Sequence, residues 1–231
     1  MANPPKNQEW STQDWNNHWD SGKLSKHIKK EYIEDLLRQE KLLFPDSGKS
    51  YRVLVPLCAK SYDMEWLASK GHSVIGLDCS ETVLKEFFVE HNMEFSEAQD
   101  GNFKVFKSKS EELDITLYAG DIFNLPSLKF EKCDAVWDYA SIVVIKPQER
   151  QKYANVITEK LTTDVSYLLC AFNFDGFVNP NGPAYHTSSK MVRDIFGDSF
   201  GIIELPDAST KHIFNGKAVA MKNFFHMTKN K

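Results

Sequence analysis

Two short runs of sequence carry the clearest signal of fold: Val53-Leu54-Val55-Pro56-Leu57-Cys58-Ala59-Lys60 and Gly71-His72-Ser73-Val74-Ile75-Gly76-Leu77-Asp78. An apolar run ends in a loop of small residues, a segment of helix length follows, and a second apolar run ends in a carboxylate. This order is typical of a strand–helix–strand unit in a nucleotide-binding sheet. Asp78 lies about twenty residues after the loop, where such folds place an acid that accepts hydrogen bonds from ribose hydroxyls.

The alternation of strand and helix continues along the chain. Apolar runs that suit strands lie at 51–55, 72–77, 115–119, 133–138 and 165–172, with a final pair at 200–205 and 218–227. Helices are expected at 61–70, 81–92, 147–161 and 188–196, with Ser80 as the N-cap of the second. A short hairpin strand is expected within the insertion 93–112. The sequence therefore predicts an α/β, Rossmann-like fold with a mostly parallel sheet and helices on both faces.

A different kind of segment precedes this sheet. Residues 1–9 are polar with two prolines, and we expect them to be disordered. Trp15 and Trp19 are four residues apart and would share one face of a helix, and 25–44 has the spacing of a second amphipathic helix. We expect one domain over 1–231, with residues 10–45 as an N-terminal helical cap.

Composition narrows the class of protein. The chain has a net charge of -4, a pI of about 6.0 and no basic stripe, so nucleic acid is not an expected partner. Its four cysteines form no CxxC pair and no Cys/His cluster with metal-ligand spacing, which predicts reduced thiols and no metal site. No apolar run could span a bilayer and no secretory signal is visible. We expect a cytoplasmic monomer that acts on a small molecule.

Polar groups recur where the predicted strands end. Asp78, Asp121 and Asp138-Tyr139 each follow an apolar run, and Leu57 lies in the first loop. Ligands of open α/β sheets bind beyond the carboxyl ends of the strands, so these residues are expected to converge. A single Asp in such a place is as often a helix cap or a turn former.

The first loop also bears on the kind of cofactor. It contains no glycine, and the chain has neither a G-x-G-x-x-G nor a G-x-x-x-x-G-K-[ST] pattern, which pyrophosphate-binding folds use to bring their backbone close to phosphates. The absence argues against an NAD-type oxidoreductase, which stays as one alternative. S-Adenosylmethionine, which has a ribose and an adenine but no pyrophosphate, fits this loop better.

A resemblance sharpens this reading. It is carried by Trp15-Asn16-Asn17-His18-Trp19-Asp20-Ser21-Gly22, Pro56-Leu57-Cys58-Ala59-Lys60, Glu86-Phe87-Phe88, Val105-Phe106-Lys107-Ser108, Asp121-Ile122-Phe123-Asn124-Leu125-Pro126, Trp137-Asp138 and Tyr167-Leu168-Leu169-Cys170. These motifs run in order over nearly the whole chain. Together they resemble the thiopurine S-methyltransferase family, which is related to the plant halide/thiol methyltransferases.

The resemblance implies a class I methyltransferase sheet of seven strands, S-adenosylmethionine as methyl donor, and a thiol or thiopurine-like sulfur as acceptor. It also implies roles for seven residues around the donor. Trp15 and Trp19 would cover the cofactor, Leu57 would lie against it, Asp78 would hold the ribose, Asp121 would lie near the adenine amino group, and Ile122 and Phe123 would flank the adenine.

The departures from the family pattern fall around the acceptor. Tyr139-Ala140 stands where the vertebrate enzymes have Arg-Gly, Lys211-His212 matches their Arg-His pair, and Ala59 replaces a loop glycine. Lys26 replaces an aromatic residue before His27. The residues expected to position or deprotonate the acceptor are Tyr139, Lys211 and His212, and the loop 179–185 is expected to form part of the acceptor pocket. The loss of the arginine predicts measurable activity on small thiols and weaker activity on thiopurines than the resemblance alone suggests. A degenerate methyltransferase fold that only binds a ligand is the second alternative.

Overall fold

The structure of the chain is a computed structural model that describes residues 9–24, 28, 34–174, 184–214 and 217–230, with the backbone alone described at 212–214 and 217–219. Several predictions from the sequence therefore fall on residues outside this description. They are the disorder of residues 1–8, the first half of the helix over 25–44, Lys26-His27, and residues 179–183 of the predicted acceptor loop.

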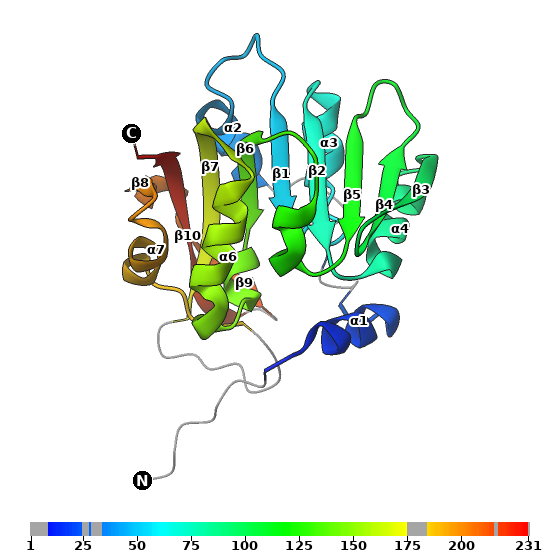
Figure 1. The fold of residues 1–231 in the computed structure, drawn as a ribbon. Helices are drawn as coiled ribbons and strands as arrows, with labels where there is room; N and C mark the ends of the chain where they lie inside the picture. Colours follow the sequence, from blue (N-terminus) through cyan, green and yellow to red (C-terminus); the bar gives the residue numbers. More distant parts are fainter. Residues whose placement is uncertain (1–8, 25–27, 29–33, 175–183, 215–216, 231) are drawn as a thin grey trace.

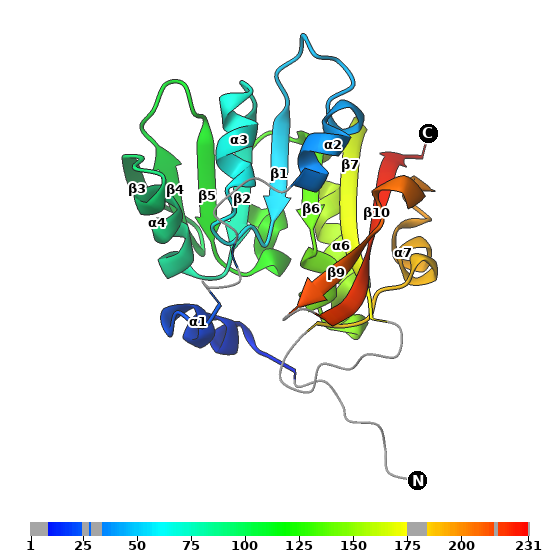
Figure 2. The same ribbon diagram turned by 180° about the vertical axis from the view of Figure 1, so that it is seen from behind.

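A ten-stranded sheet runs through the described residues (Figures 1 and 2), in the order β3-β4-β5-β2-β1-β6-β7-β10-β8, with β9 paired to β10. Strands β5, β2, β1, β6 and β7 are parallel, and β10 is antiparallel to each of its partners. The strands are β1 (Arg52–Pro56), β2 (Ser73–Asp78), β3 (Phe95–Asp100), β4 (Phe103–Ser108), β5 (Ile115–Ala119), β6 (Cys133–Tyr139), β7 (Leu161–Asn173), β8 (Phe200–Glu204), β9 (Thr210–Phe214) and β10 (Lys217–Lys229).

Helices cover both faces of this sheet, as Figures 1 and 2 show from opposite sides. The α-helices are α1 (Thr12–Asp20), α2 (Glu34–Leu43), α3 (Asp63–Ser69), α4 (Glu81–Glu90), α5 (Ser141–Val144), α6 (Arg150–Glu159) and α7 (Ser189–Phe196), and the 3-10 helices are η2 (Ile122–Ser127), η3 (Pro147–Glu149) and η4 (Pro206–Ala208). Helices α2, α3 and α4 bury their apolar side chains on one face, and α6 and α7 on the other.

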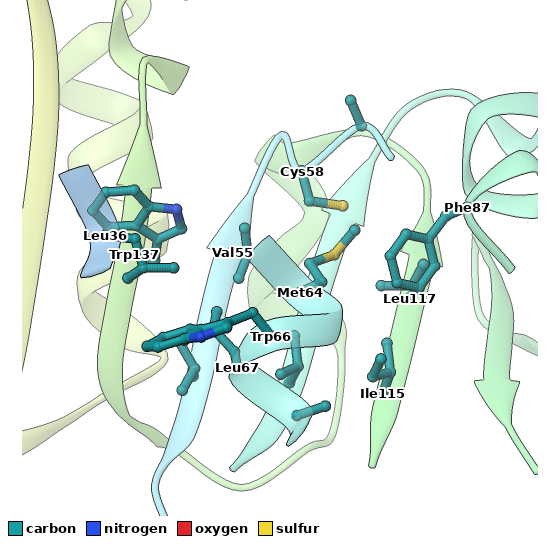
Figure 3. Packing of buried hydrophobic residues seen from close by; sticks show 14 of the residues in the cluster. Leu36, Val55, Cys58, Met64, Trp66, Leu67, Phe87, Ile115, Leu117 and Trp137 are labelled. Atoms are coloured by element: carbon teal, nitrogen blue, oxygen red, sulfur yellow. The ribbon is translucent and has the colours of Figure 1, made fainter. Parts of the chain in front are cut away.

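The packing on the first face is tight. Figure 3 shows Trp137 and Val55 of the sheet beside Leu36 of α2 and Met64 of α3, and all four are at most 4% exposed. Burying a side chain of this size contributes roughly 1.5–3 kcal/mol relative to leaving it in water. These contacts hold α2 and α3 against the strands whose ends carry the predicted site residues.

Local sequence signals explain where helices begin. Ser80 caps α4 as the sequence predicts, because its Oγ accepts a hydrogen bond from the Val83 N–H at 3.3 Å. Ser11 and Asp14 form a capping box at the start of α1. Gly71, with φ of 83°, directly follows the C-cap residue of α3 and adopts a conformation that favours glycine.

The class I methyltransferase fold is confirmed, and its seven-stranded frame is β5-β2-β1-β6-β7-β10-β8. The sheet is nevertheless larger than predicted. The insertion folds as a complete hairpin, β3–β4, which pairs with β5 and widens the sheet, and β9 lies in what the sequence indicated was a connecting loop. None of the described helices is long and apolar enough to cross a membrane.

Candidate functional site

The predicted site residues gather at one edge of the sheet. Strands β1, β2, β5 and β6 are parallel, and α1 lies beyond the ends to which their arrows point (Figures 1 and 2). Leu57, Asp78, Asp121 and Tyr139 lie at or directly after these strand ends. The convergence that the strand-end pattern indicated is therefore present in the fold.

Asp78 ties the first loop to the end of β2. Its Oδ2 accepts a hydrogen bond from the Ala59 N–H at 3.0 Å, and its Oδ1 accepts one from the Ser80 N–H at 3.2 Å. Burial raises the pKa of the Asp78 carboxyl, while these backbone N–H groups act to lower it. A carboxylate has about four acceptor sites, of which the Ala59 and Ser80 N–H groups use two, and Cys79 also contacts this carboxylate. Ribose hydroxyls could bond to Asp78 by sharing the capacity that remains.

The loop itself is held in a demanding backbone conformation. Leu57 and Ala59 have φ of 46° and 47°, in the left-handed region where a side chain costs about 1–2 kcal/mol. Lys60 anchors the loop to α4 through ion pairs with Glu86 at 2.6 Å and Glu90 at 2.8 Å. The resemblance includes Lys60 in its motif, but sequence reasoning gave it no role, and the structure makes it an anchor.

Cys58 lies in the same loop and is not a nucleophile. Its thiol is buried, and burial raises its pKa well above the usual range. The cysteine therefore stays a neutral thiol packed between β1 and β2, where its N–H donates to the Leu77 carbonyl at 3.0 Å. No group of three His, Cys, Asp or Glu side chains within the described residues could hold a metal ion.

Asp121 begins the 3-10 helix that follows β5. Its Oδ1 accepts a hydrogen bond from the Phe123 N–H at 2.9 Å, so the side chain acts as the helix cap that an Asp after a strand often provides. Asp121 is exposed, Ile122 is buried in the core on the α6 face, and Phe123 is half-buried. Lys152 Nζ lies 4.3 Å from the centroid of the Phe123 ring.

The two tryptophans of α1 have different surroundings. Trp19 is 8% exposed and belongs to the core on the α2–α4 face, whereas Trp15 is half-buried and lies edge-on to Trp10, 4.8 Å between ring centroids. A hydrogen bond of 2.7 Å from Thr82 Oγ1 to Asp20 Oδ1 joins α1 to the start of α4. Trp19 therefore packs α1 onto the domain, and Trp15 is the more accessible of the two.

A buried network fixes the end of β6. Asp138 is fully buried, and its Oδ2 accepts hydrogen bonds of 2.7 Å from the hydroxyls of both Tyr153 and Tyr167. Burial raises the pKa of Asp138, and these bonds oppose that rise. Ser141 Oγ donates to the Pro56 carbonyl at 2.8 Å, which joins the turn after β6 to the end of β1. The network sets the backbone from which Tyr139 projects, and single-sequence reasoning missed it.

A cavity of about 530 Å³ opens beside the first loop, on the face that α2 and α3 cover. Its size lies within the range typical of small-molecule sites. It is lined by Ile28, Glu34, Asp35, Arg38, Val55, Pro56, Leu57, Cys58, Ala59, Ser61, Asp63, Trp137, Tyr139, Ala140, Phe172, Thr210 and Lys222. Of the predicted site residues, Leu57 and Tyr139 line this cavity.

Tyr139 lines the cavity and is packed among aromatic rings. Ring centroids of Trp137 and Phe172 lie 5.7 and 6.3 Å from its own. Burial raises the pKa of the Tyr139 hydroxyl well above its usual range. Tyr139 therefore keeps its proton at neutral pH, and its hydroxyl can donate a hydrogen bond to an acceptor but cannot serve as a base.

The predicted pair Lys211-His212 lies on β9. Lys211 is exposed and is absent from the cavity wall, while its neighbour Thr210 lines the cavity, because successive residues of a strand point to opposite faces. His212 lies opposite Ala220 in the β9–β10 register, and its side chain is not described. Among the described residues, the lysine that lines the cavity is Lys222 of β10, to which the sequence pattern gives no role.

Comparison with known proteins agrees with this geometry. A family model described as Thiopurine S-methyltransferase (TPMT) matches residues 10–229. The thiopurine S-methyltransferase of Mus musculus is 34% identical over 199 residues, covering 85% of this chain and 81% of the mouse protein. That of Panthera pardus is 32% identical over 200 residues, covering 85% and 80%.

Solved structures are similar in fold at low sequence identity. The 1,6-didemethyltoxoflavin-N1-methyltransferase of Burkholderia thailandensis, bound to S-adenosylhomocysteine, has a TM-score of 0.66 at 11% identity and covers 98% of this chain and 94% of that one. The magnesium protoporphyrin IX methyltransferase of Synechocystis PCC 6803 has a TM-score of 0.62 at 15% identity, covering 94% and 100%. By its family match and its relatives, this chain belongs to the thiopurine S-methyltransferase family.

Proposed function

We propose that this protein transfers the methyl group of S-adenosylmethionine to the sulfur of a thiol or thiopurine-like acceptor. Membership of the thiopurine S-methyltransferase family supports the reaction class. The observation that carries the proposal is the Asp78 carboxylate, held against the Leu57–Lys60 loop at a strand end, with a cavity of small-molecule size lined by the same loop. Donor and acceptor would meet where the two adjoin.

The residues at this edge fit the proposed donor. Asp78 has acceptor capacity for ribose hydroxyls, and the loop lacks the glycines that a pyrophosphate would need. We propose that Leu57 contacts the donor, that Asp121, Ile122 and Phe123 bound its adenine end, and that α1 covers it through Trp15 and Trp19. S-Adenosylmethionine supplies a methyl group already activated by a sulfonium.

The protein's task is then to orient the acceptor. A lone pair of the acceptor sulfur forms the new carbon–sulfur bond as the sulfonium's carbon–sulfur bond breaks, and a thiol acceptor gives up its proton to solvent. In-line approach requires the reacting atoms to lie about 3–3.5 Å apart in a site that excludes water. Free thiols titrate near pH 8.5, so a strong base is not needed. Tyr139 orients the sulfur through its hydroxyl, and His212 is a further candidate to position it. Lys211, which is exposed and absent from the cavity wall, would act on the acceptor only from outside that wall.

One screen tests the proposal. Labelled S-adenosylmethionine is incubated with the protein and a panel of small thiols and thiopurines, and donor binding is measured separately by calorimetry. Label transferred to a sulfur acceptor supports the function. Donor binding without transfer to any member would indicate the degenerate binding protein instead, and absence of donor binding would contradict the site.

We also propose that the protein is a cytoplasmic monomer and one methyltransferase domain whose N-terminal helices form a cap. Its four cysteines are free, as is usual in a reducing compartment. The acidic net charge of -4 accords with a small-molecule acceptor in place of nucleic acid. Size-exclusion chromatography with light scattering tests the monomer.

A further inference from the structure

A lysine of β10, the last strand in the sequence, lies on the wall of the cavity. Lys222 of β10 lines the cavity, and its Nζ lies 5.9 Å from the centroid of the Tyr139 ring. Its ammonium forms an ion pair with Asp35 of α2 at 2.5 Å. The side chain of Lys222 is 15% exposed and that of Asp35 is 7% exposed, so the lysine is the more accessible partner.

The hydrogen-bonding capacity of this cation is not used up by the protein. A lysine ammonium has three N–H donors, and within the described residues Asp35 is the one acceptor that Lys222 meets. Thr210 lies directly opposite Lys222 in the β9–β10 register and also lines the cavity. Its Oγ1 is buried and has no hydrogen-bond partner among the described residues. One wall of the cavity therefore holds an ammonium with donors to spare beside a hydroxyl that has no partner among the described residues.

The other charged groups on the described part of the cavity wall are either well exposed or already accept a hydrogen bond. Arg38 pairs with Glu34 at 2.8 Å on the exposed rim of α2. Asp63 accepts a hydrogen bond from Trp137 Nε1 at 2.9 Å. Among the described residues, Lys222 is thus the partly buried cation that an acceptor within the cavity would meet next to Tyr139.

We infer that Lys222, with Thr210 beside it, holds an anionic substituent of the sulfur acceptor, such as a carboxylate, and so determines which acceptors are methylated. This rests on the proposed methyltransferase function. The vertebrate pattern has an arginine at the position of Tyr139, and here a positive charge reaches the same cavity from β10. Tyr139 alone would favour neutral thiols, and Lys222 reverses that expectation for small thiols that carry a negative charge.

The test compares three small thiols that differ mainly in charge: 3-mercaptopropionate, 2-mercaptoethanol and cysteamine. For each, kcat/KM for methyl transfer is measured with the wild type and with Lys222→Met. We expect Lys222→Met to lower kcat/KM for mercaptopropionate about ten-fold or more, with about two-fold change or less for mercaptoethanol. The affinity for S-adenosylmethionine, measured by calorimetry, should stay unchanged.

Two further variants guard against a loss of folding, because Lys222→Met leaves the Asp35 carboxylate buried without its partner. The double variant Asp35→Asn/Lys222→Met removes both charges and should show the same selective loss. Lys222→Arg keeps the charge and should restore activity on mercaptopropionate. Lys190→Met breaks an exposed ion pair with Asp194 on α7 and serves as the matched control, with an unchanged ratio between acceptors.

An equal fall for all three thiols, an unchanged ratio in both the single and double variants, or a selective loss of cysteamine would overturn the inference while leaving the methyltransferase function intact. If the wild type binds the donor but methylates neither a thiol nor a thiopurine, the proposed function fails and takes this inference with it. The two failures are therefore distinguishable.

Discussion

The carboxylate of Asp78 accepts a hydrogen bond from the backbone N–H of Ala59, 3.0 Å away and 19 residues earlier in the chain. The bond joins the end of β2 to the loop after β1. Asp78, the residue proposed to bind the ribose, therefore also fixes the loop from which Leu57 lines the cavity. A substitution at Asp78 should therefore alter both the contacts with the donor and the conformation of the loop.

Replacing Asp78 by Ala should weaken binding of S-adenosylmethionine by ten-fold or more. The reason is that a charged hydrogen-bond acceptor is worth about 1.5–3 kcal/mol when its partners are left unmatched. Calorimetry with the purified variant measures the affinity, and circular dichroism checks that it is folded. An unchanged affinity in a folded variant would remove Asp78 from the donor site.

Glycine should be tolerated better than alanine at two turns. Ala59 and Ala140 have φ of 47° and 67°, where glycine carries no side-chain penalty. We expect Ala59→Gly and Ala140→Gly each to raise the free energy of unfolding by about 0.5–1 kcal/mol. Ala154→Gly, within α6, is the control and should lower it by about 1 kcal/mol or more. Urea denaturation gives all three values, and a loss at position 59 as large as that at 154 would argue against a strained loop.

The two tryptophans of α1 should have different roles, with Trp15 contributing to donor binding and Trp19 to packing. Trp19→Ala removes a side chain that is 8% exposed and should cost about 3 kcal/mol of stability or more. Trp15→Ala should leave the melting temperature nearly unchanged and weaken donor affinity about three- to ten-fold, if the ring covers the cofactor. Thermal denaturation and calorimetry distinguish the two effects. Full donor affinity in Trp15→Ala would leave α1 as a packing element.

Tyr139→Phe should lower the rate of methyl transfer about ten-fold without altering the shape of its pH profile. Burial raises the pKa of Tyr139, so its hydroxyl is protonated throughout the range in which thiols titrate. The rise in rate with pH should therefore follow the acceptor thiol in both proteins. A limb of the profile that disappears in Tyr139→Phe would show that Tyr139 titrates during catalysis.

Stability should decrease as the pH falls from about 7 to 5, in part because of two histidines. Burial lowers the pKa values of His72 and His226 below the ordinary 6.5, so the unfolded chain binds more protons in this window and low pH favours it. The variant His72→Asn/His226→Gln should show a shallower loss of melting temperature over the same range.

The comparison between variant and wild type isolates the histidines in this measurement. Asp78 and Asp138 have raised pKa values and change stability in the opposite direction, losing it as pH rises above their ordinary 3.8, but they are present in both proteins. Parallel curves for wild type and variant would assign the pH dependence to other groups.

Local sequence patterns predict most of the strands and helices of the sheet domain. The apolar run 115–119 is β5 to the residue, and the Ser80 cap and the helix it begins lie where the spacing indicates. Contacts between distant segments were not predictable in this way. Lys222 and Asp35 are 187 residues apart, and nothing in either neighbourhood marks the other.

The residues proposed to hold the acceptor are also hard to predict from local sequence patterns. Matching Lys211 to a family motif gives its position along the chain but not the face of the strand on which it lies. The sequence pattern does not mark 210–214 as a strand, so the alternation of side chains along β9 cannot be read from it and nothing in it points to Thr210. The role of Asp138 likewise depends on Tyr153 and Tyr167, which come from α6 and β7.

The antiparallel β9–β10 hairpin has a consequence for how such an enzyme diversifies. The proposed donor contacts come from α1 and from residues at or just after the ends of β1, β2 and β5, whereas Thr210 and Lys222 line the cavity from this hairpin. Substitutions in the hairpin can therefore alter acceptor choice while the donor-binding half keeps its sequence. A chimaera that exchanges this hairpin with that of a relative is a direct route to new acceptors on an unchanged donor platform.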